Sequence, residues 1–349
     1  MNHADYNFII SSNISILQAM KYMDEIMRKL LIVEKENKFI GLLTLGDIQR
    51  AIINNHSMAT PVAAIMRKDY IVAKPDQEVD EIKKTMLSIR AEFMPVIDEE
   101  NNLIRVYFWN DLFGEGTKGP LFFFNIPVVV MAGGVGTRLR PLTNVFPKSL
   151  MPIKDKTIIE EIFDRFYNHG CTNFYISVNY KADLTEYYLK QQNLPYNLNF
   201  FREDIPLGTA GSLSLLKGVI NETFFVSNCD ILINQDYSEI LKYHRANKNE
   251  ITVVAALRHF SIQYGTIETG ETGRLVDLVE KPEITLKINS GMYILESHLI
   301  NEIPPRVFYH ITDLIKSLRN EGRKVGVFPV SEKSWTDIGT MTEYVSLIK

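Results

Sequence analysis

The 349-residue sequence has little of three things that mark specialised classes of protein: cysteine, excess charge and long apolar runs. Its two cysteines, Cys171 and Cys229, lie far apart and show no metal-ligand spacing, which argues against a disulfide framework and favours a reducing compartment. The 38 basic and 42 acidic residues nearly balance, so no broad basic surface indicates a nucleic-acid partner. Any anion-binding site must therefore be formed by a few basic residues that lie close together.

The most apolar stretch, residues 121–131, is interrupted by Asn125 and Pro127. It is also much shorter than the roughly 20 residues that span a bilayer. The first residues, MNHADYNF, are polar where a secretory signal needs an apolar run. We therefore expect a cytoplasmic protein without a membrane partner.

An internal repeat organises the first third of the chain. The apolar spacing of residues 16–23 returns at 79–86, and the pattern of residues 37–48 returns at 101–112. Each copy is typical of an amphipathic helix, two short strands and an Asp near the start of a second helix. The repeat therefore predicts a small α+β domain at residues 1–115, with copies at about 9–55 and 62–113.

A glycine- and proline-rich stretch, GEGTKGP, follows the second copy and cannot form a stable helix or a central strand. We place a linker at residues 116–125 and a second domain at residues 126–349. There, apolar runs alternate with helical patterns such as residues 157–170, which Gly170 ends. The alternation predicts an α/β, Rossmann-like domain with a mixed, mostly parallel sheet and sites at the carboxyl ends of its strands. The expected strands are residues 128–131, 174–178, 224–228, 251–257 and 325–330.

The first expected strand leads into a glycine-rich loop, AGGVGTR. Gly133, Gly134 and Gly136 let the backbone approach a ligand closely, with N–H groups facing a phosphate or a base. The loop lacks the last glycine of a dinucleotide fingerprint and the Gly-Lys-Ser/Thr of a P-loop. Alone it could be only a tight turn, but Arg138 and Lys148 add two cations nearby. Because like unit charges about 4 Å apart repel by roughly 4 kcal/mol at an effective dielectric of about 20, cations are needed wherever two phosphate groups must meet.

Residues 127–349 contain five ordered motifs: GGVGTRLRPLT with PKSLMPI, LGTAGSL (207–213), SNCD (227–230), EKP (280–282) with NSGMY (289–293), and WTDIGT (335–340). Together they resemble the signature of the sugar-1-phosphate nucleotidyltransferases, which make nucleotide sugars from a nucleoside triphosphate and a sugar 1-phosphate. The resemblance implies a Mg²⁺-dependent enzyme in which the sugar phosphate attacks the α-phosphate and pyrophosphate leaves. Ser149 departs from the family, which commonly has Pro or Gln after the lysine.

The resemblance also implies a role for residues of each motif. Arg138 and Lys148 would act in catalysis, with Lys148 at the α-phosphate. Asp230 and Asp337 would bind Mg²⁺, and carboxylates together with phosphates suit this hard cation. The nucleotide would contact Ala132, Gly133, Gly134, Gly136, Thr137, Gly208, Thr209 and Ala210. The sugar phosphate would contact Gly265, Glu280, Lys281 and Asn289.

The N-terminal repeat resembles a pair of cystathionine-β-synthase-type (CBS) modules. In that family a Thr and an Asp of a G-x-x-T-x-x-D pattern bind adenine nucleotides. The first copy keeps GLLTLGD, with Thr44 and Asp47, whereas Arg105 and Phe108 replace the Gly and Thr of the second. The resemblance implies at most one adenine nucleotide, at Thr44 and Asp47. The alternative is a purely structural pair that serves packing or dimerisation, and we expect a homo-oligomer.

The nucleobase and the sugar are less closely defined. The SNCD and LGTAG motifs with a CBS fusion look most like guanylyltransferases, so GTP is the favoured nucleotide. The favoured sugar is glucosamine 1-phosphate, for legionaminic acid or related surface glycans, and mannose or heptose 1-phosphate is possible. Alternatives are thymidylyl, uridylyl or cytidylyl transfer, or a non-catalytic nucleotide-sensing subunit. A missing Asp230, Asp337 or Lys148 would favour the subunit, but all three are present.

Overall fold

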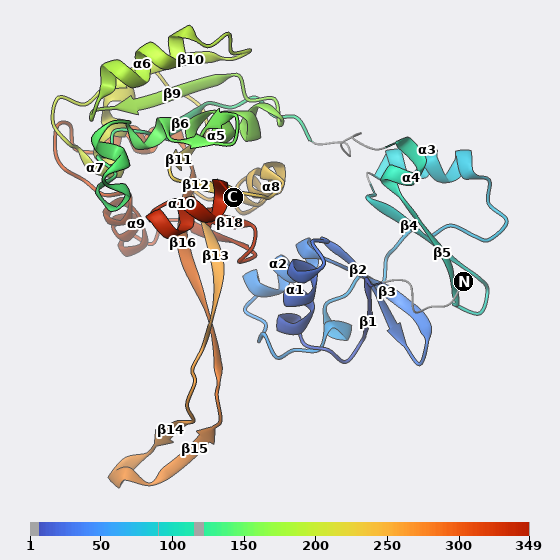
Figure 1. Cartoon of the computed structure of the whole chain (residues 1–349). Helices are drawn as coiled ribbons and strands as arrows, with labels where there is room; N and C mark the ends of the chain where they lie inside the picture. Colours follow the sequence, from blue (N-terminus) through green and yellow to red (C-terminus); the bar gives the residue numbers. More distant parts are fainter. Residues whose placement is uncertain (1–6, 90, 115–121, 349) are drawn as a thin grey trace. The chain divides into compact units, whose positions relative to one another are not determined.

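Figure 1 shows the computed structural model, which describes residues 7–89, 91–114 and 122–348. The chain divides into two compact units, Met1–Leu121 and Phe122–Lys349. Residues 116–121 of the expected linker lie outside the described residues. Phe124 already belongs to the second unit, since its N–H donates to the carbonyl of His169 over 2.7 Å. Within the described ranges, no helix is long and apolar enough to cross a membrane.

The first unit contains the expected repeat. In each copy a helix precedes two antiparallel strands and a second helix, whose third residue is Asp47 or Asp111. The copies fold alike because their apolar residues recur on one side of each element, so that the equivalent residues Met23 and Met86 are both buried. The elements are β1 (Ile9–Ser11), α1 (Ile16–Glu25), β2 (Leu30–Lys35), β3 (Lys38–Thr44), α2 (Leu45–Ile53), η2 (Val62–Ala64), α3 (Val79–Ile89), β4 (Phe93–Ile97), β5 (Leu103–Phe108) and α4 (Trp109–Phe113).

In the described part of the second unit, seven strands form one sheet in the order β10-β9-β6-β11-β16-β13-β17. Only β16 runs antiparallel to its neighbours, so the predicted α/β fold with a mostly parallel sheet is confirmed. All five expected strands are present, and β10 and β16, which the sequence analysis did not predict, join them in the sheet. The strands are β6 (Val128–Met131), β9 (Asn173–Val178), β10 (Asn197–Arg202), β11 (Phe224–Asn228), β13 (Ile251–Ser261), β16 (Glu283–Leu295) and β17 (Val325–Val330).

Helices cover both faces of this sheet. Val128 and Val130 of β6 belong to a core shared with α5, α6, α8 and α10, whereas Val129 belongs to a second core with α7 and α9. α5 begins where Thr157 and Glu160 form a capping box. The helices are α5 (Ile158–Tyr167), α6 (Ala182–Gln191), α7 (Gly208–Gly211), α8 (Tyr237–Asn247), α9 (Ile311–Asn320) and α10 (Met341–Ile348), with the short turns η3 (Thr137–Leu139), η4 (Leu142–Asn144), η5 (Lys148–Leu150), η6 (Ser212–Leu216), η7 (Glu271–Gly273) and η8 (Ser297–Glu302).

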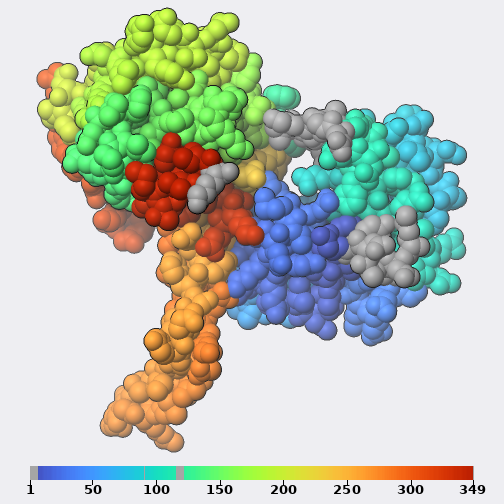
Figure 2. Space-filling view, in the orientation of Figure 1, coloured from blue at the N-terminus to red at the C-terminus, as the bar shows by residue number. Residues whose placement is uncertain are grey.

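Three two-stranded pairs complete the described part of the second unit: β7 (Pro152–Ile153) with β8 (Lys156–Thr157), β12 (Ile231–Ile233) with β18 (Trp335–Asp337), and β14 (Thr266–Thr269) with β15 (Leu275–Val279). The last pair is the end of an arm, which we define as residues 258–287. In the arm, β13 and β16 stay paired beyond the sheet as far as Ser261 and Glu283. The arm, drawn in orange, extends away from the body of the unit (Figures 1 and 2).

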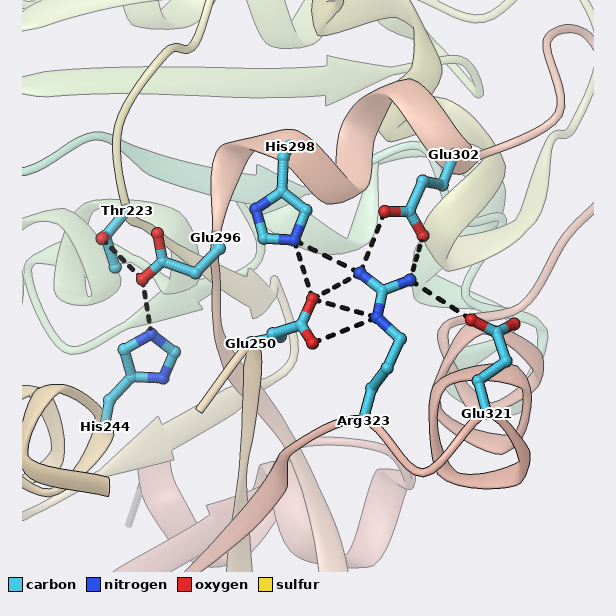
Figure 3. Close-up of polar contacts among 8 residues, drawn as sticks. All are labelled: Thr223, His244, Glu250, Glu296, His298, Glu302, Glu321 and Arg323. Atoms are coloured by element: carbon cyan, nitrogen blue, oxygen red, sulfur yellow. Dashed lines mark hydrogen bonds and ion pairs between the residues drawn. The ribbon is translucent and has the colours of Figure 1, made fainter. Parts of the chain in front are cut away.

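A network of charged residues joins the loops at the start of β13 and β17 (Figure 3). The Arg323 guanidinium lies between the carboxylates of Glu250 and Glu302, and His298 Nε2 lies 2.8 Å from Glu250 Oε2. The hydrogen bond from Arg323 is the main reason that the pKa of Glu250 falls from 4.5 to about 2. The network lies at the amino ends of the parallel strands, so it stabilises the sheet at the edge opposite the strand ends where sites are expected.

We predict that Glu250→Gln lowers the free energy of unfolding at pH 7 by about 1–2 kcal/mol, because it leaves the half-buried Arg323 without its main partner. A lowered carboxyl pKa stabilises the fold above pH 4.5, and this contribution is lost as the pH falls towards 2. Chemical denaturation at pH 7 and at pH 3 measures both effects. The control, Glu321→Gln, removes a more exposed carboxylate 3.4 Å from Arg323. Equal losses in the two variants would contradict the assigned role of Glu250.

Candidate active site

A cavity of about 380 Å³ lies at the carboxyl ends of the central strands of the second unit. The glycine-rich loop after β6 forms one wall. Nine of the residues predicted from the sequence line the cavity: Gly133, Gly134, Gly136, Thr137, Arg138, Lys148, Gly208, Thr209 and Asp230. The lining also includes residues that the sequence analysis did not select: Met131, Ser177, Glu203, Pro206, Asn228, Cys229, Phe308, His310 and Gly339.

Gly136 explains how the loop brings Lys148 into the cavity. Its φ is +66°, in the left-handed region that favours glycine. A Cβ at this position would lie 2.9 Å from Thr143 Cγ2 and 3.1 Å from Lys148 Cβ. Thr143 Oγ1 also donates to the carbonyl of Gly136 over 2.9 Å. The missing side chain therefore allows the Lys148 segment to pack directly against the loop.

Lys148 and Asp230 form an ion pair inside the cavity. Lys148 Nζ lies 2.7 Å from Asp230 Oδ2, and the Lys148 side chain is only 8% exposed. The two residues are 82 positions apart in the sequence, and they meet because η5 and the carboxyl end of β11 share the same edge of the sheet. Burying an ammonium group without a partner is costly, and the Asp230 carboxylate supplies that partner.

Asp337 completes a group of four charged residues. Pairing of β12 with β18 places Asp337 opposite Ile231, and the N–H of Ile338 donates to the carbonyl of Asp230 over 2.7 Å. A Cβ on Gly339 would lie 2.8 Å from Asp337 Oδ1 and 3.2 Å from Arg138 Nη1, so Arg138 reaches the same place. Burial raises the pKa of the Asp337 carboxyl, and the nearby Asp230 carboxylate raises that pKa further.

The LGTAG segment forms the opposite wall, and its glycines serve close packing. Gly208 has a φ of +75°, and a Cβ there would lie 2.8 Å from the Tyr309 carbonyl oxygen. Thr209 Oγ1 accepts a 3.0 Å hydrogen bond from the N–H of Ile311. Ala210 and, across the cavity, Ala132 are buried in the cores and do not line the cavity. Their predicted contacts with a nucleotide would therefore be indirect.

Glu203 is the main feature of the cavity that sequence reasoning missed. It follows β10, and its carboxylate accepts hydrogen bonds from Ser177 Oγ and from the N–H of Leu207, the latter over 2.9 Å. A Cβ on Gly133 would lie 3.2 Å from Glu203 Oε1, so the carboxylate faces the glycine-rich loop. The strand-end rule could have found Glu203, but β10 itself was not recognised.

Comparison with known proteins agrees with this geometry. The family model for nucleotidyl transferases matches residues 127–349, which is more than half of the chain. The chain belongs to the nucleotidyl transferase family. The model for the CBS domain matches residues 5–54 and 62–114, which correspond to the two copies of the repeat.

Named relatives of this nucleotidyl transferase include the mannose-1-phosphate guanylyltransferase catalytic subunit beta of Dictyostelium discoideum (28% identical over 225 residues) and the mannose-1-phosphate guanyltransferase of Schizosaccharomyces pombe (30% over 227 residues). In both cases the match covers 62% of this chain and 62% of the relative. Among solved structures, HddC from Yersinia pseudotuberculosis is 25% identical with a TM-score of 0.51, over 64% of this chain and 98% of that chain. HddC has also been solved in complex with GMP-PN.

The structure places the predicted sugar-phosphate residues of the nucleotidyl transferase unit outside this cavity. Gly265, Glu280 and Lys281 lie in the arm, where a Cβ on Gly265 would be 2.9 Å from Glu280 Oε2. Asn289 lies at the base of the arm, and its Nδ2 donates to the Tyr293 hydroxyl over 2.8 Å. The cavity of this nucleotidyl transferase thus holds the predicted phosphate and base residues but none of the predicted sugar-phosphate residues.

In the CBS pair, Thr44 and Asp47 are brought together, but they bond to each other. They form a capping box at the start of α2, in which Thr44 Oγ1 donates to Asp47 Oδ2 over 2.6 Å. The Asp47 side chain is only 3% exposed, and it pairs with the guanidinium groups of Arg50 and Arg67. These contacts give Thr44 and Asp47 a structural role in the first copy, and the adenine nucleotide there stays a prediction.

We predict opposite effects on stability for the two carboxylates of the cavity. Asp337→Asn removes a like charge beside Asp230, so the melting temperature without ligand should stay unchanged or rise. Asp230→Asn leaves the buried Lys148 ammonium unpaired, and the melting temperature should fall. Differential scanning calorimetry of the two variants at pH 7, with metal removed, measures both. A lower melting temperature for Asp337→Asn than for Asp230→Asn would contradict this description of the site.

Proposed function

We propose that the protein is a sugar-1-phosphate nucleotidyltransferase that transfers GMP from GTP to a sugar 1-phosphate. The observation that supports this most strongly is the Lys148–Asp230 ion pair, which lies in one cavity with Arg138 and the glycine-rich loop. A buried cation beside the backbone N–H groups of a glycine-rich loop suits a triphosphate. A non-catalytic nucleotide-sensing subunit would not need Lys148 and Asp230 to be fixed against each other.

The reaction is a single displacement. A phosphate oxygen of the sugar 1-phosphate forms a bond to the α-phosphorus, the bond between that phosphorus and the β-phosphate bridge breaks, and pyrophosphate leaves. The chain needs no covalent intermediate, because positioning and neutralisation of charge account for acceleration. Lys148 would lie against the α-phosphate, Arg138 and Thr137 against the outgoing phosphates, and the loop glycines against the triphosphate backbone.

The residues present fit a Mg²⁺ ion. No group of three potential metal-ligating side chains occurs among the residues that the structure describes, but Asp230 and Asp337 meet beside the cavity. Mg²⁺ is commonly held by one or two carboxylates together with phosphates and water. Burial raises the pKa of Asp337, and the neighbouring Asp230 carboxylate raises it further, so a cation bound between the two carboxylates would be favourable. When bound, Mg²⁺ would neutralise negative charge on the reacting phosphates.

The test is a pyrophosphate-release assay with GTP, ATP, UTP, CTP and dTTP against a panel of sugar 1-phosphates. We predict turnover with GTP, and a loss on the order of 10²- to 10³-fold in kcat for Lys148→Ala, as for other preorganised electrostatic groups. Lys154→Ala, in which an exposed lysine is removed, is the control and should keep wild-type activity. Absence of pyrophosphate release with every pair would contradict the function. A change in KM for the sugar phosphate alone would reassign Lys148 to that substrate.

Glu203 supports the choice of guanine. On its Watson–Crick edge guanine presents two adjacent donors, N1–H and N2–H, which a carboxylate can accept together. Uracil and thymine present one donor between two carbonyl oxygens, and a carboxylate repels these oxygens. The Glu203 carboxylate lies beside the glycine-rich loop, and both Glu203 and the aromatic residue Phe308 line the cavity. We infer that Glu203 reads the base.

Glu203→Gln replaces one acceptor by a donor, so we expect kcat/KM for GTP to fall by about 10- to 100-fold, in line with the loss of one charge-assisted hydrogen bond. The preference for GTP over UTP should fall with it. The matched control is Asp204→Asn at the exposed neighbouring carboxylate, which should keep the preference. If Glu203→Gln leaves the ratio of kcat/KM for GTP and UTP unchanged, another group selects the base.

Two sugar 1-phosphates are candidates for the second substrate. Glucosamine 1-phosphate is our favoured substrate from the sequence motifs, for legionaminic acid or a related surface glycan. The relatives are named for mannose 1-phosphate, which makes it the second choice. The assay panel therefore includes both, together with a heptose 1-phosphate.

An adenine nucleotide at the CBS pair stays a prediction. The contacts of Asp47 lead to a competing prediction, in which this carboxylate stabilises the fold. Asp47→Asn removes the charge that Arg50 and Arg67 share, so thermal stability should fall without any ligand, by about 1–3 kcal/mol. Asp111→Asn in the second copy is the control, since that exposed carboxylate accepts a 3.3 Å bond from Phe108. Melts of the wild type with AMP, ADP and ATP complete the test. A ligand at about 100 times its Kd would add roughly 2.7 kcal/mol.

A further inference from the structure

The turn between β9 and α6, residues 179–181, is bonded to the loop that follows β6. The two segments lie side by side because β9 and β6 are neighbours in the sheet (Figure 1). The N–H of Tyr180 donates to the carbonyl of Gly133 over 3.4 Å, and the Tyr180 hydroxyl donates to the carbonyl of Thr143 over 3.1 Å. The turn therefore contacts the loop both at its start and after its glycine-rich part.

Lys181 adds charge-assisted contacts between the same two segments. Its Nζ donates to the carbonyl oxygens of Asn144 and of Val145, in each case over 2.6 Å. Among the residues that the structure describes, no carboxylate lies within ion-pair distance of this ammonium group. Hydrogen bonds from a charged donor are roughly twice as strong as those between neutral groups. The charge of Lys181 is thus committed to the loop.

The part of the loop that Lys181 contacts has little other support. Between the buried residues Thr143 and Pro147, residues 144–146 are exposed, with Val145 at 62% and Phe146 at 51%. Their own backbone hydrogen bonds are local, within one turn that starts at residue 141. A segment with few buried apolar contacts opens more readily than the core. The contacts from the turn after β9 therefore hold residues 144–146 in place.

These residues are connected directly to two walls of the cavity. Thr143 Oγ1 donates to the carbonyl of Gly136 over 2.9 Å, and Gly136 lines the cavity. On the other side, Lys148 follows Phe146 by two positions and also lines the cavity. A displacement of residues 143–146 would therefore move both the loop glycine and the cavity lysine.

The backbone of Lys181 indicates that the local fold does not explain the choice of lysine. Its φ is +53°, in the left-handed region that residues other than glycine rarely adopt. Such conformations persist where surrounding contacts hold them, and they cluster at functional sites. Lys181 is also the N-cap of α6, and its side chain makes no capping hydrogen bond. Asparagine suits both the left-handed conformation and the N-cap, so local structure alone would favour asparagine.

We propose that Lys181 is a positioning residue that orders the loop before the nucleotide binds. By holding residues 143–146, it keeps Gly136 and Lys148 where a triphosphate needs them. A loop that must become ordered on binding lowers affinity, so a loop that is already ordered binds more tightly. The effect on GTP rests on the proposed function, whereas the ordering of the loop does not.

Hydrogen exchange of the full-length protein without ligand tests the ordering. Asparagine is two atoms shorter than lysine and cannot reach both carbonyls, so Lys181→Asn removes the contact while keeping a residue suited to the backbone. We expect the amides of Val145 and Phe146 to exchange about 10-fold faster, in line with the loss of a hydrogen bond to a charged group. Amides of β6 should exchange as in the wild type, which separates a local effect from a loss of global stability. The control is Lys190→Asn, at an exposed lysine of the same helix, which should leave the loop amides unchanged.

Unchanged exchange of the loop amides in Lys181→Asn would overturn the ordering. Faster exchange of the β6 amides by the same factor would also overturn it, because Lys181 would then stabilise the whole unit rather than the loop.

Calorimetric titration with GTP and Mg²⁺, without a sugar phosphate, tests the consequence for the nucleotide. We expect the Kd of Lys181→Asn for GTP to rise about 10-fold, with a less favourable binding entropy, because the loop must then become ordered on binding. Lys181→Arg, which can still donate to both carbonyls, should keep most of the affinity. In steady-state assays the KM for the sugar 1-phosphate should stay at the wild-type value.

Wild-type affinity for GTP in Lys181→Asn, despite faster exchange, would overturn the role of Lys181 in positioning. If the wild type binds none of the nucleoside triphosphates, the proposed function is contradicted instead, and hydrogen exchange alone decides whether Lys181 orders the loop.

Discussion

The ion pair between Lys148 and Asp230 is the interaction on which the site depends. It joins a loop after the first strand of the sheet to the end of a strand some eighty residues later, and it puts a fixed positive charge at the strand ends. The left-handed Gly136 lets the lysine approach, and the β12–β18 pairing brings Asp337 alongside Asp230. Without a ligand, the site already brings together two basic side chains, which suit phosphates, and two carboxylates, which suit a metal ion.

The same unit divides its charged groups between two edges of the sheet. At the amino ends, Arg323 and its carboxylates satisfy one another, and the pKa of Glu250 is lowered accordingly. At the carboxyl ends, burial raises the pKa of Asp337, and the nearby Asp230 carboxylate raises it further. A network whose charges are all paired stabilises the fold, whereas a carboxylate with a raised pKa beside a cavity is a candidate for a functional site. This contrast is independent of sequence resemblance and points to the same edge as the candidate active site.

Much of the fold could be predicted from the sequence, because apolar periodicity and glycine positions determine it locally. The repeat, the five apolar strands and the glycine-rich loop all follow from such patterns. β10 and β16 were not predicted, although both begin with the alternation of polar and apolar residues that is typical of a strand, NLNF and EITLKI, and Glu203 was missed with β10. Glu280 and Lys281 lie in the arm because β13 and β16 stay paired beyond the central sheet. The sequence does not show how far that pairing continues, so their position could not be predicted. The buried ion pairs of Asp47 depend on Arg67, which lies twenty residues away and has no local signal.

The central claim is that this cavity transfers the α-phosphoryl group of a nucleotide to a sugar phosphate. The most direct measurement follows isotopic label in a single turnover with excess enzyme, Mg²⁺ and either glucosamine 1-phosphate or mannose 1-phosphate. With [α-³²P]GTP the label should appear in the nucleotide sugar, and with [γ-³²P]GTP it should appear only in pyrophosphate. Label from the γ position on the sugar, or released as inorganic phosphate, would contradict the account and indicate a kinase or a phosphohydrolase instead.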